Sequence, residues 1–164
     1  MAIYHLHAQV ISRSSGRSAV AASAYRAGVR LVSDRDGLIH DYTRKGGITY
    51  SAMLAPDGAP AWALDRAQLW DRVEATERRK DAQLCREFDI ALPVELSNAA
   101  KADLISGWVQ RELVALGMVA QIDGHHWSGD NPHAHVMATL RPIEGDGFGK
   151  KAREWNRPEV LEHL

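Results

Sequence analysis

Three histidines lie within ten residues of one another late in this chain, and they constrain the possible fold more than any other feature. His133 and His135 are separated by a single residue, and a largely apolar run, residues 136–140, follows them. Successive side chains of a β-strand point to opposite faces, so two residues that are two positions apart share a face. The pattern therefore predicts a strand over residues 133–141 that presents two potential metal ligands on one side.

The residues before this strand predict a hairpin. Residues 129–132 read Gly-Asp-Asn-Pro, which is typical of a connection between two strands, and residues 118–123 have the composition of the preceding strand. A third imidazole, His126, can fold in from that side. Because imidazole is a common ligand of divalent metals, the hairpin predicts a three-histidine metal site. The alternative is that the histidines are only polar side chains on the solvent-exposed face of a half-buried strand.

Length and composition favour one domain with a hydrophobic core, since the chain has 164 residues and 45% hydrophobic content. Its single cysteine, Cys85, cannot form an internal disulfide, and no signal peptide or transmembrane run is visible, so we expect a cytoplasmic protein.

The net charge of −1 does not indicate a polyanionic partner. Residues 1–50, however, carry an excess of arginine and lysine over aspartate, which is a local sign of such a partner.

Hydrophobic periodicity and capping residues predict strands and helices in a mixed order. We expect strands at residues 2–11, 86–92, 118–123 and 133–141, with short strands within 29–55, and helices from Ser14 or Ser15 to about 27, at 65–77 and at 97–116. Strands and helices without regular alternation indicate an α+β domain with a largely antiparallel sheet. The sequence ends in what resembles the opening of another helix, so we expect residues 1–164 to be a single domain at the N-terminus of a longer protein.

Three blocks of this sequence resemble the MobA/MobL family of conjugative relaxases. Residues 14–28, an alanine-rich run containing Tyr25, resemble the first family motif, and residues 74–93 resemble the middle block. Residues 126–137 resemble the metal motif, the HUH signature of two histidines around a hydrophobic residue. The blocks occur in the family order and cover most of residues 3–141. The resemblance implies the HUH relaxase fold, an α+β domain with a largely antiparallel central sheet, a ferredoxin-like palm and flanking helices.

The resemblance also implies an enzyme that nicks one strand of plasmid DNA at an origin of transfer. It assigns the nucleophile to Tyr25, whose attack would give a 5′-phosphotyrosyl bond and a free 3′-hydroxyl, reversible by religation. It assigns the metal to His126, His133 and His135, with His125 on the opposite face. The implied partners are single-stranded origin DNA beside a hairpin, accessory relaxosome proteins and a coupling protein.

The chemistry of these residues agrees with that assignment. A phenol, with an ordinary pKa of about 10, is a weak nucleophile at neutral pH and needs charge neutralisation at the phosphate. We expect Mg²⁺ or Mn²⁺ to supply it, although imidazole suits Mn²⁺ and later metals better than Mg²⁺, so the sequence leaves the ion open. Glu87, on the middle strand, is predicted either to orient a histidine ring or to accept the Tyr25 proton. Glu74 and Asp81 are alternatives for that role.

Basic residues near the nucleophile and in the tail are predicted to bind the DNA backbone. Arg26 and Arg30 have helical spacing and could share a face beside Tyr25. The full set of predicted DNA contacts is Arg13, Arg17, Arg26, Arg30, Lys150 and Lys151. For each of these residues, ordinary surface charge is the alternative.

The order of the motifs favours a relaxase over other HUH enzymes. Tyr25 precedes the histidine pair, whereas rolling-circle replication initiators and transposase-type HUH nucleases usually place the tyrosine after it. A metal-dependent hydrolase that uses activated water, with Tyr25 structural, is a further alternative. So is a DNA-binding module with a structural metal. The products separate these classes, because only tyrosine attack leaves a covalent protein–DNA adduct.

Overall fold

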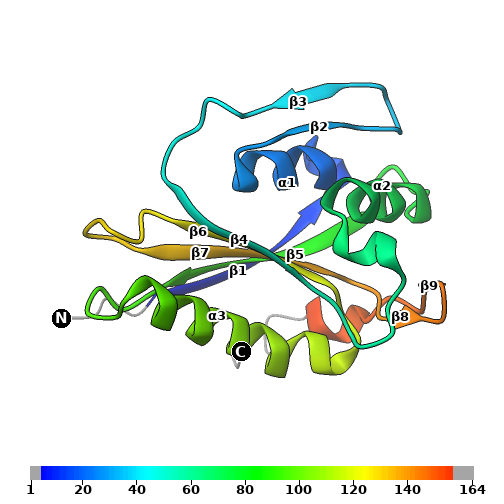
Figure 1. Cartoon of the computed structure of the whole chain (residues 1–164). Helices are drawn as coiled ribbons and strands as arrows, with labels where there is room; N and C mark the ends of the chain where they lie inside the picture. Colours follow the sequence, from blue (N-terminus) through cyan, green and yellow to red (C-terminus); the bar gives the residue numbers. More distant parts are fainter. Residues whose placement is uncertain (1–4, 157–164) are drawn as a thin grey trace.

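A five-stranded antiparallel sheet forms the centre of the computed structural model, which describes residues 5–156 (Figure 1). The strand order is β1-β5-β7-β6-β4, and every neighbouring pair runs antiparallel. The strands are β1 Leu6–Ser12, β4 Ile48–Leu54, β5 Gln83–Ala91, β6 Ala120–His125 and β7 His133–Thr139. The predicted α+β class with a largely antiparallel central sheet is confirmed.

Helices cover both faces of this sheet (Figure 1). The helices α1 (Ala19–Ala27) and α2 (Arg66–Thr76) lie on one face, and α3 (Asn98–Glu112) lies on the other. Two hydrophobic clusters result: Met137 of β7 belongs to the cluster under α1 and α2, and Val136 belongs to the one over α3. Strand β7 is thus buried on both sides, which explains why it reads as a nearly continuous apolar run.

Smaller elements complete the domain. The hairpin of β2 (Arg30–Val32) and β3 (Ile39–Asp41) stands over the outer side of α1 (Figure 1), and β8 (Ile143–Glu144) pairs with β9 (Gly147–Phe148). Short 3₁₀ turns lie at Arg13–Ser15, Ala61–Leu64, Val114–Leu116 and Arg153–Asn156. Within residues 5–156, no helix is long and apolar enough to cross a membrane.

Helix α1 is shorter than predicted at its beginning. Ser18, rather than Ser14 or Ser15, caps it, and the Ser18 side chain accepts a hydrogen bond from the Ala21 N–H. The helix ends at Gly28, whose φ of 65° is a left-handed conformation that glycine adopts easily. Arg30 therefore lies on β2. The prediction that Arg26 and Arg30 share a helical face was wrong, because the helix ends between them.

Strand β6 is longer than predicted, and this difference matters for the site. It continues past residue 123 to His125, with Gly124 opposite Ala134 and His125 opposite His133. A Cβ on Gly124 would lie 2.4 Å from the ring of Trp127. Because glycine leaves this space free, the indole folds back against the strand, and its Nε1–H donates to the His133 carbonyl at 3.0 Å.

The buried side-chain amide of Gln121 joins helices α1 and α2 to the sheet. The side-chain oxygen of Gln121, on β6, accepts hydrogen bonds from Ser23 of α1 at 2.6 Å and from the Trp70 indole of α2 at 2.8 Å. Its nitrogen donates to the Ser23 carbonyl and to the Asp123 carboxylate. Gln121 is fully buried, and each of its polar atoms is paired, as buried amides require.

Replacing Gln121 by leucine should lower the free energy of unfolding by about 2–4 kcal/mol, because it leaves buried donors of Ser23 and Trp70 unpaired. Urea unfolding monitored by circular dichroism measures this. Gln110→Leu, at an exposed position of α3, is the matched control and should change stability by less than about 0.5 kcal/mol. Equal effects of the two substitutions would contradict the structural role of Gln121.

Candidate metal centre and nucleophile

Three imidazoles converge at the end of the sheet where β6 turns into β7. One potential ligand nitrogen from each of His125, His133 and His135 lies within 4.8 Å of the others. His125 and His133 are directly opposed across the two strands, and His135 lies two residues further along the same face. The ring centroids of His125 and His135 are 4.7 Å apart. These three nitrogens are close enough to bind one metal ion.

The third histidine of this group is His125, which corrects the prediction of His126. Since β6 extends through His125, the alternation of the strand places that ring on the face of His133. His126 leaves the strand with a φ of 55°, and its side chain is exposed. Its backbone N–H donates to the Gly47 carbonyl at 2.8 Å. The difference between the predicted and the observed group comes from the end of the strand, which lies beyond the predicted residue 123.

Hydrogen bonds fix the orientation of two of the rings. His125 Nε2 lies 2.7 Å from the Arg26 carbonyl, and His133 Nδ1 lies 2.8 Å from the Asn131 carbonyl. A carbonyl only accepts, so each of these nitrogens carries the proton and the other ring nitrogen keeps its lone pair for a metal. His135 Nδ1 is buried and has no hydrogen-bond partner among the described residues. The donor set therefore fits a divalent cation.

Burial keeps two of the imidazoles neutral. It lowers the pKa of His125 to about 4 and the pKa of His135 to about 2. The nearby charges of Arg26 and Lys45 lower both pKa values further. At neutral pH these two ligands need not lose a proton before they bind a metal.

Tyr25 lies in the last turn of α1, and its side chain is 44% exposed. Its ring contacts the edge of the Tyr42 ring, with centroids 5.2 Å apart, and the Lys45 ammonium lies 3.6 Å from its centroid. An open surface groove runs past the tyrosine, and its charged lining residues are Arg17, Arg26 and Asp36. The phenol is therefore accessible to a ligand that enters this groove.

Arg26 connects this tyrosine to the histidines. Its carbonyl accepts the hydrogen bond from His125, and its guanidinium pairs with the buried carboxylate of Glu87 on β5. Glu87 also accepts a 3.4 Å hydrogen bond from Gln9 and lies 3.9 Å from the Arg17 guanidinium. The structure thus places Glu87 beneath the last turn of α1, where it contacts the helix that carries Tyr25.

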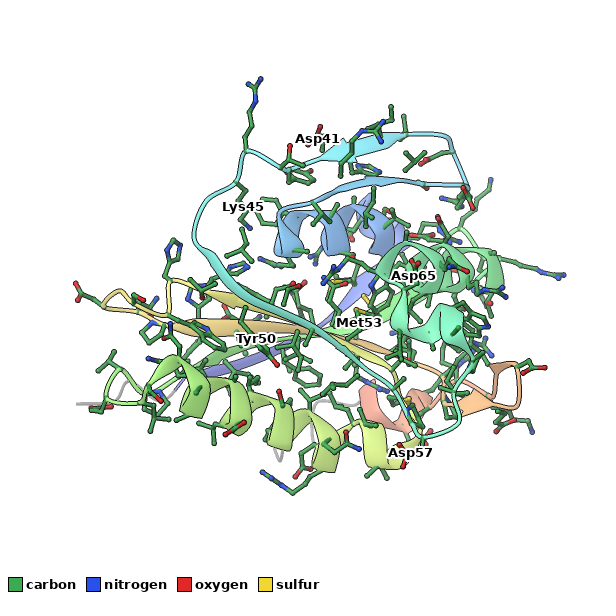
Figure 2. The ribbon with its side chains drawn as sticks, viewed as in Figure 1. Asp41, Lys45, Tyr50, Met53, Asp57 and Asp65 are labelled. Atoms are coloured by element: carbon green, nitrogen blue, oxygen red, sulfur yellow. The ribbon has the colours of Figure 1, made fainter. Side chains whose placement is uncertain are left out.

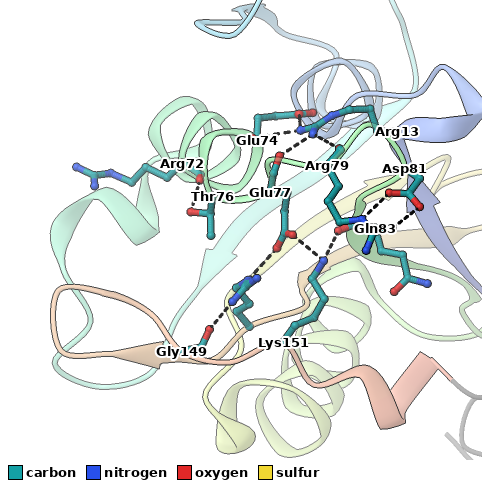
Figure 3. A network of polar contacts seen from close by, with 11 residues as sticks. Arg13, Arg72, Glu74, Thr76, Glu77, Arg79, Asp81, Gln83, Gly149 and Lys151 are labelled. Carbon is teal, nitrogen blue, oxygen red and sulfur yellow. Dashed lines mark hydrogen bonds and ion pairs between the residues drawn. The ribbon is translucent and has the colours of Figure 1, made fainter.

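Two of the predicted DNA-binding cations have internal partners instead (Figure 3). The Arg13 side chain is 8% exposed, and it donates to the Glu74 carboxylate and to the carbonyls of Glu77 and Arg79. Lys151 donates to the Glu77 carboxylate at 2.7 Å. Carboxylates from α2 and the turn after it pair with both charges, so these contacts do not favour the predicted roles of Arg13 and Lys151 in DNA binding.

The other candidates occupy different environments. Glu74 is buried, and besides binding Arg13 it accepts the Ala19 N–H at the start of α1, whereas Asp81 forms an exposed pair with Arg79. The side chains of Arg17 and Arg26 are 36% and 19% exposed beside Tyr25. Arg30, on β2, and Lys150, after β9, are exposed. Of the predicted basic residues, Arg17 and Arg26 are the two that border the groove with Tyr25.

A family model described as the MobA/MobL family matches residues 17–160. The chain belongs to the MobA/MobL family. The resemblance in its three sequence blocks is therefore confirmed.

Among MobA/MobL relatives, the mobilization protein MobL of Acidithiobacillus ferridurans is 40% identical over 94% of this chain and 47% of its own length. The conjugal transfer protein TraA of Rhizobium radiobacter is 42% identical over 92% of this chain and 14% of its own length. The chain thus spans less than half of these relatives.

A solved structure described as the molecular basis of vancomycin resistance transfer in Staphylococcus aureus has the same fold. It superposes with a TM-score of 0.91 at 31% sequence identity, and the match covers 99% of this chain and 86% of that one. The agreement extends over the whole MobA/MobL domain described above.

We predict that His125→Ala weakens metal binding by more than about tenfold, because it removes one of three ligands. Isothermal titration with Mn²⁺ measures the affinity. His126→Ala is the matched control, since it changes the neighbouring histidine of the same hairpin, and should leave the affinity within about twofold. A larger loss of Mn²⁺ affinity in His126→Ala than in His125→Ala would instead favour His126 as the third ligand.

The low pKa values of His125 and His135 also predict a pH-dependent stability in the presence of a chelator. Between pH about 6.5 and about 4, the unfolded chain protonates these histidines while the folded chain does not, so stability falls as the pH falls. His135→Gln should reduce this decrease in urea-unfolding experiments. His7→Gln, at an exposed position of β1, should leave it unchanged. If the free energy of unfolding decreased equally as the pH fell in the wild type and both variants, protonation of these rings would be excluded as the cause.

Proposed function

We propose that this chain is the nicking domain of a conjugative relaxase, in which Tyr25 attacks a phosphodiester of single-stranded origin-of-transfer DNA. The observation that carries the proposal is the hydrogen bond between the Arg26 carbonyl, next to Tyr25, and His125 of the metal-ligand group. It joins the turn of α1 that carries the potential nucleophile to one histidine of the potential Lewis-acid site. The names of the relatives, which refer to mobilization and conjugal transfer, support the same function.

In the proposed reaction, the Tyr25 Oη forms a bond to phosphorus while the bond from phosphorus to the 3′-oxygen breaks. The phenol loses its proton and the departing 3′-oxygen gains one, so the products are a 5′-phosphotyrosyl linkage and a free 3′-hydroxyl. One ester replaces another, and the reverse reaction can therefore reseal the strand without ATP.

A divalent ion, for which we propose Mn²⁺ or Mg²⁺, would be held by His125, His133 and His135 and would supply charge neutralisation at the scissile phosphate when bound. The neutral imidazoles leave the full positive charge of that ion for the phosphate. The protein's own part is to orient the ligands. His125 and His133 are each held by a backbone carbonyl, which fixes the direction of the remaining lone pair.

Glu87 acts in this proposal as a positioning residue rather than as a base. Its carboxylate holds the Arg26 side chain, and thereby the turn of α1 that carries both Tyr25 and the carbonyl bound to His125. Arg17, at the rim of the groove, is left to contact DNA phosphates. A DNA hairpin beside the nick, accessory relaxosome proteins and a coupling protein are the proposed partners of the complete protein.

Tyr25→Phe should abolish the covalent adduct while it preserves the fold and metal binding. The assay is a denaturing gel of the protein mixed with Mn²⁺ and single-stranded DNA that tiles the origin of its own plasmid, which also maps the nick. Tyr50→Phe is the control, because the Tyr50 hydroxyl contacts Ser106 of α3 on the other side of the sheet. It should form the adduct at the wild-type rate. Cleaved DNA without an adduct in any of the proteins would indicate attack by metal-activated water and would contradict the proposal.

A further inference from the structure

Lys45 lies on the segment between β3 and β4, twenty residues from Tyr25 in the sequence (Figure 2). Its ammonium donates a 2.9 Å hydrogen bond to the Tyr25 carbonyl and lies 3.6 Å from the centroid of the tyrosine ring. A cation this close to an aromatic face is held there electrostatically. The Lys45 ammonium thus lies closer to the centre of the Tyr25 ring than the Arg26 guanidinium carbon does, at 3.6 Å against 5.4 Å.

The same ammonium is linked to the proposed metal site through consecutive residues of α1. Lys45 donates to the Tyr25 carbonyl, and His125 donates to the next carbonyl along the chain, that of Arg26. One turn of the helix therefore binds both the cation and a histidine of the proposed site.

Among the described residues, Lys45 has no carboxylate partner within hydrogen-bonding distance. The partly buried cations Arg13, Arg26 and Lys151 each pair with a carboxylate, whereas no such ion pair forms at Lys45 within residues 5–156, where Asp123 acts on it only from a longer distance. An ammonium has three donors, and here one of them binds the Tyr25 carbonyl. A partly buried cation with unused donors favours an anionic ligand.

Backbone contacts hold the segment that carries Lys45. Its N–H donates to the Tyr42 carbonyl at 2.9 Å, and the Tyr42 ring packs against Tyr25. Two residues later, Gly47 accepts the N–H of His126 and has a φ of 83°. A Cβ on Gly47 would lie 2.3 Å from the His126 ring, so the close approach requires glycine. The ammonium is therefore placed before DNA arrives.

We propose that Lys45 is a further catalytic residue, whose ammonium binds a non-bridging oxygen of the scissile phosphate beside Tyr25. It neutralises the charge that accumulates on that phosphate while the bond to Tyr25 Oη forms. Lysine suits this role because it binds phosphate as a compact point charge. The inference rests on the proposed function, since it takes Tyr25 as the nucleophile.

The first test is the rate of adduct formation under single-turnover conditions with the mapped nick-site oligonucleotide and Mn²⁺. Lys45→Met should lower this rate by about 100-fold, the usual effect of removing one donor to a developing oxyanion. Lys45→Arg keeps the charge and should recover part of the rate. Lys80→Met, in the exposed turn before β5, is the matched control and should react like the wild type. Urea unfolding confirms that each variant is folded.

The second test separates phosphate binding from a structural role. In a Tyr25→Phe background, which cannot cleave, affinity is measured for the same oligonucleotide with either a normal phosphodiester or a neutral methylphosphonate at the nick. Lys45→Met should weaken binding of the phosphodiester by about tenfold and leave binding of the methylphosphonate unchanged. Equal losses for both oligonucleotides, or a wild-type rate in Lys45→Met, would overturn the role of Lys45. Failure of the wild type to form any adduct would instead overturn the proposed function.

Discussion

The hydrogen bond from His125 to the Arg26 carbonyl is the contact on which the arrangement of the site depends. That carbonyl lies at the C-terminal end of α1, where helix carbonyls lack partners within the helix. A histidine from the sheet satisfies it, and by doing so orients its own ring. One interaction thus completes a helix end and fixes the direction of a proposed metal ligand. The helix that carries Tyr25 and the strand that carries His125 cannot shift independently without breaking it.

Polar contacts fasten α1 along its whole length. Glu74 accepts the Ala19 N–H at its start, Gln121 binds Ser23 in its middle, and Glu87 holds Arg26 at its end. The helix is rich in alanine, so its packing surface is small and brings little hydrophobic stabilisation. Specific hydrogen bonds compensate for this and also select one position of the helix on the sheet. Glu74 and Glu87, the two buried carboxylates among the predicted catalytic candidates, both make such contacts with α1.

Sequence periodicity predicted the sheet, the helices and the shared face of His133 and His135, because these features depend on local alternation. It failed at His125, where the decision between two adjacent histidines depends on how far β6 continues, and this is set by pairing with β7. It also gave no sign of the ion pairs of Arg13 and Lys151, since no local pattern reveals that carboxylates from α2 and the turn after it reach them. The sequence also gave no reason to single out Lys45, because the fold alone brings it into contact with Tyr25, twenty residues away.

Contacts on the α3 face of the sheet, opposite to the three histidines, hold the turn that carries them. Trp127 folds against Gly124 and donates to the His133 carbonyl, while Lys101, on α3, donates to the Trp127 carbonyl at 3.2 Å. Packing against α3 therefore supports the turn that carries the three histidines. In small zinc domains, metal binding supplies the folding energy. In this chain the contacts with α3 hold the turn, so we expect a chelator to leave the domain folded and the proposed metal to bind after folding rather than to drive it.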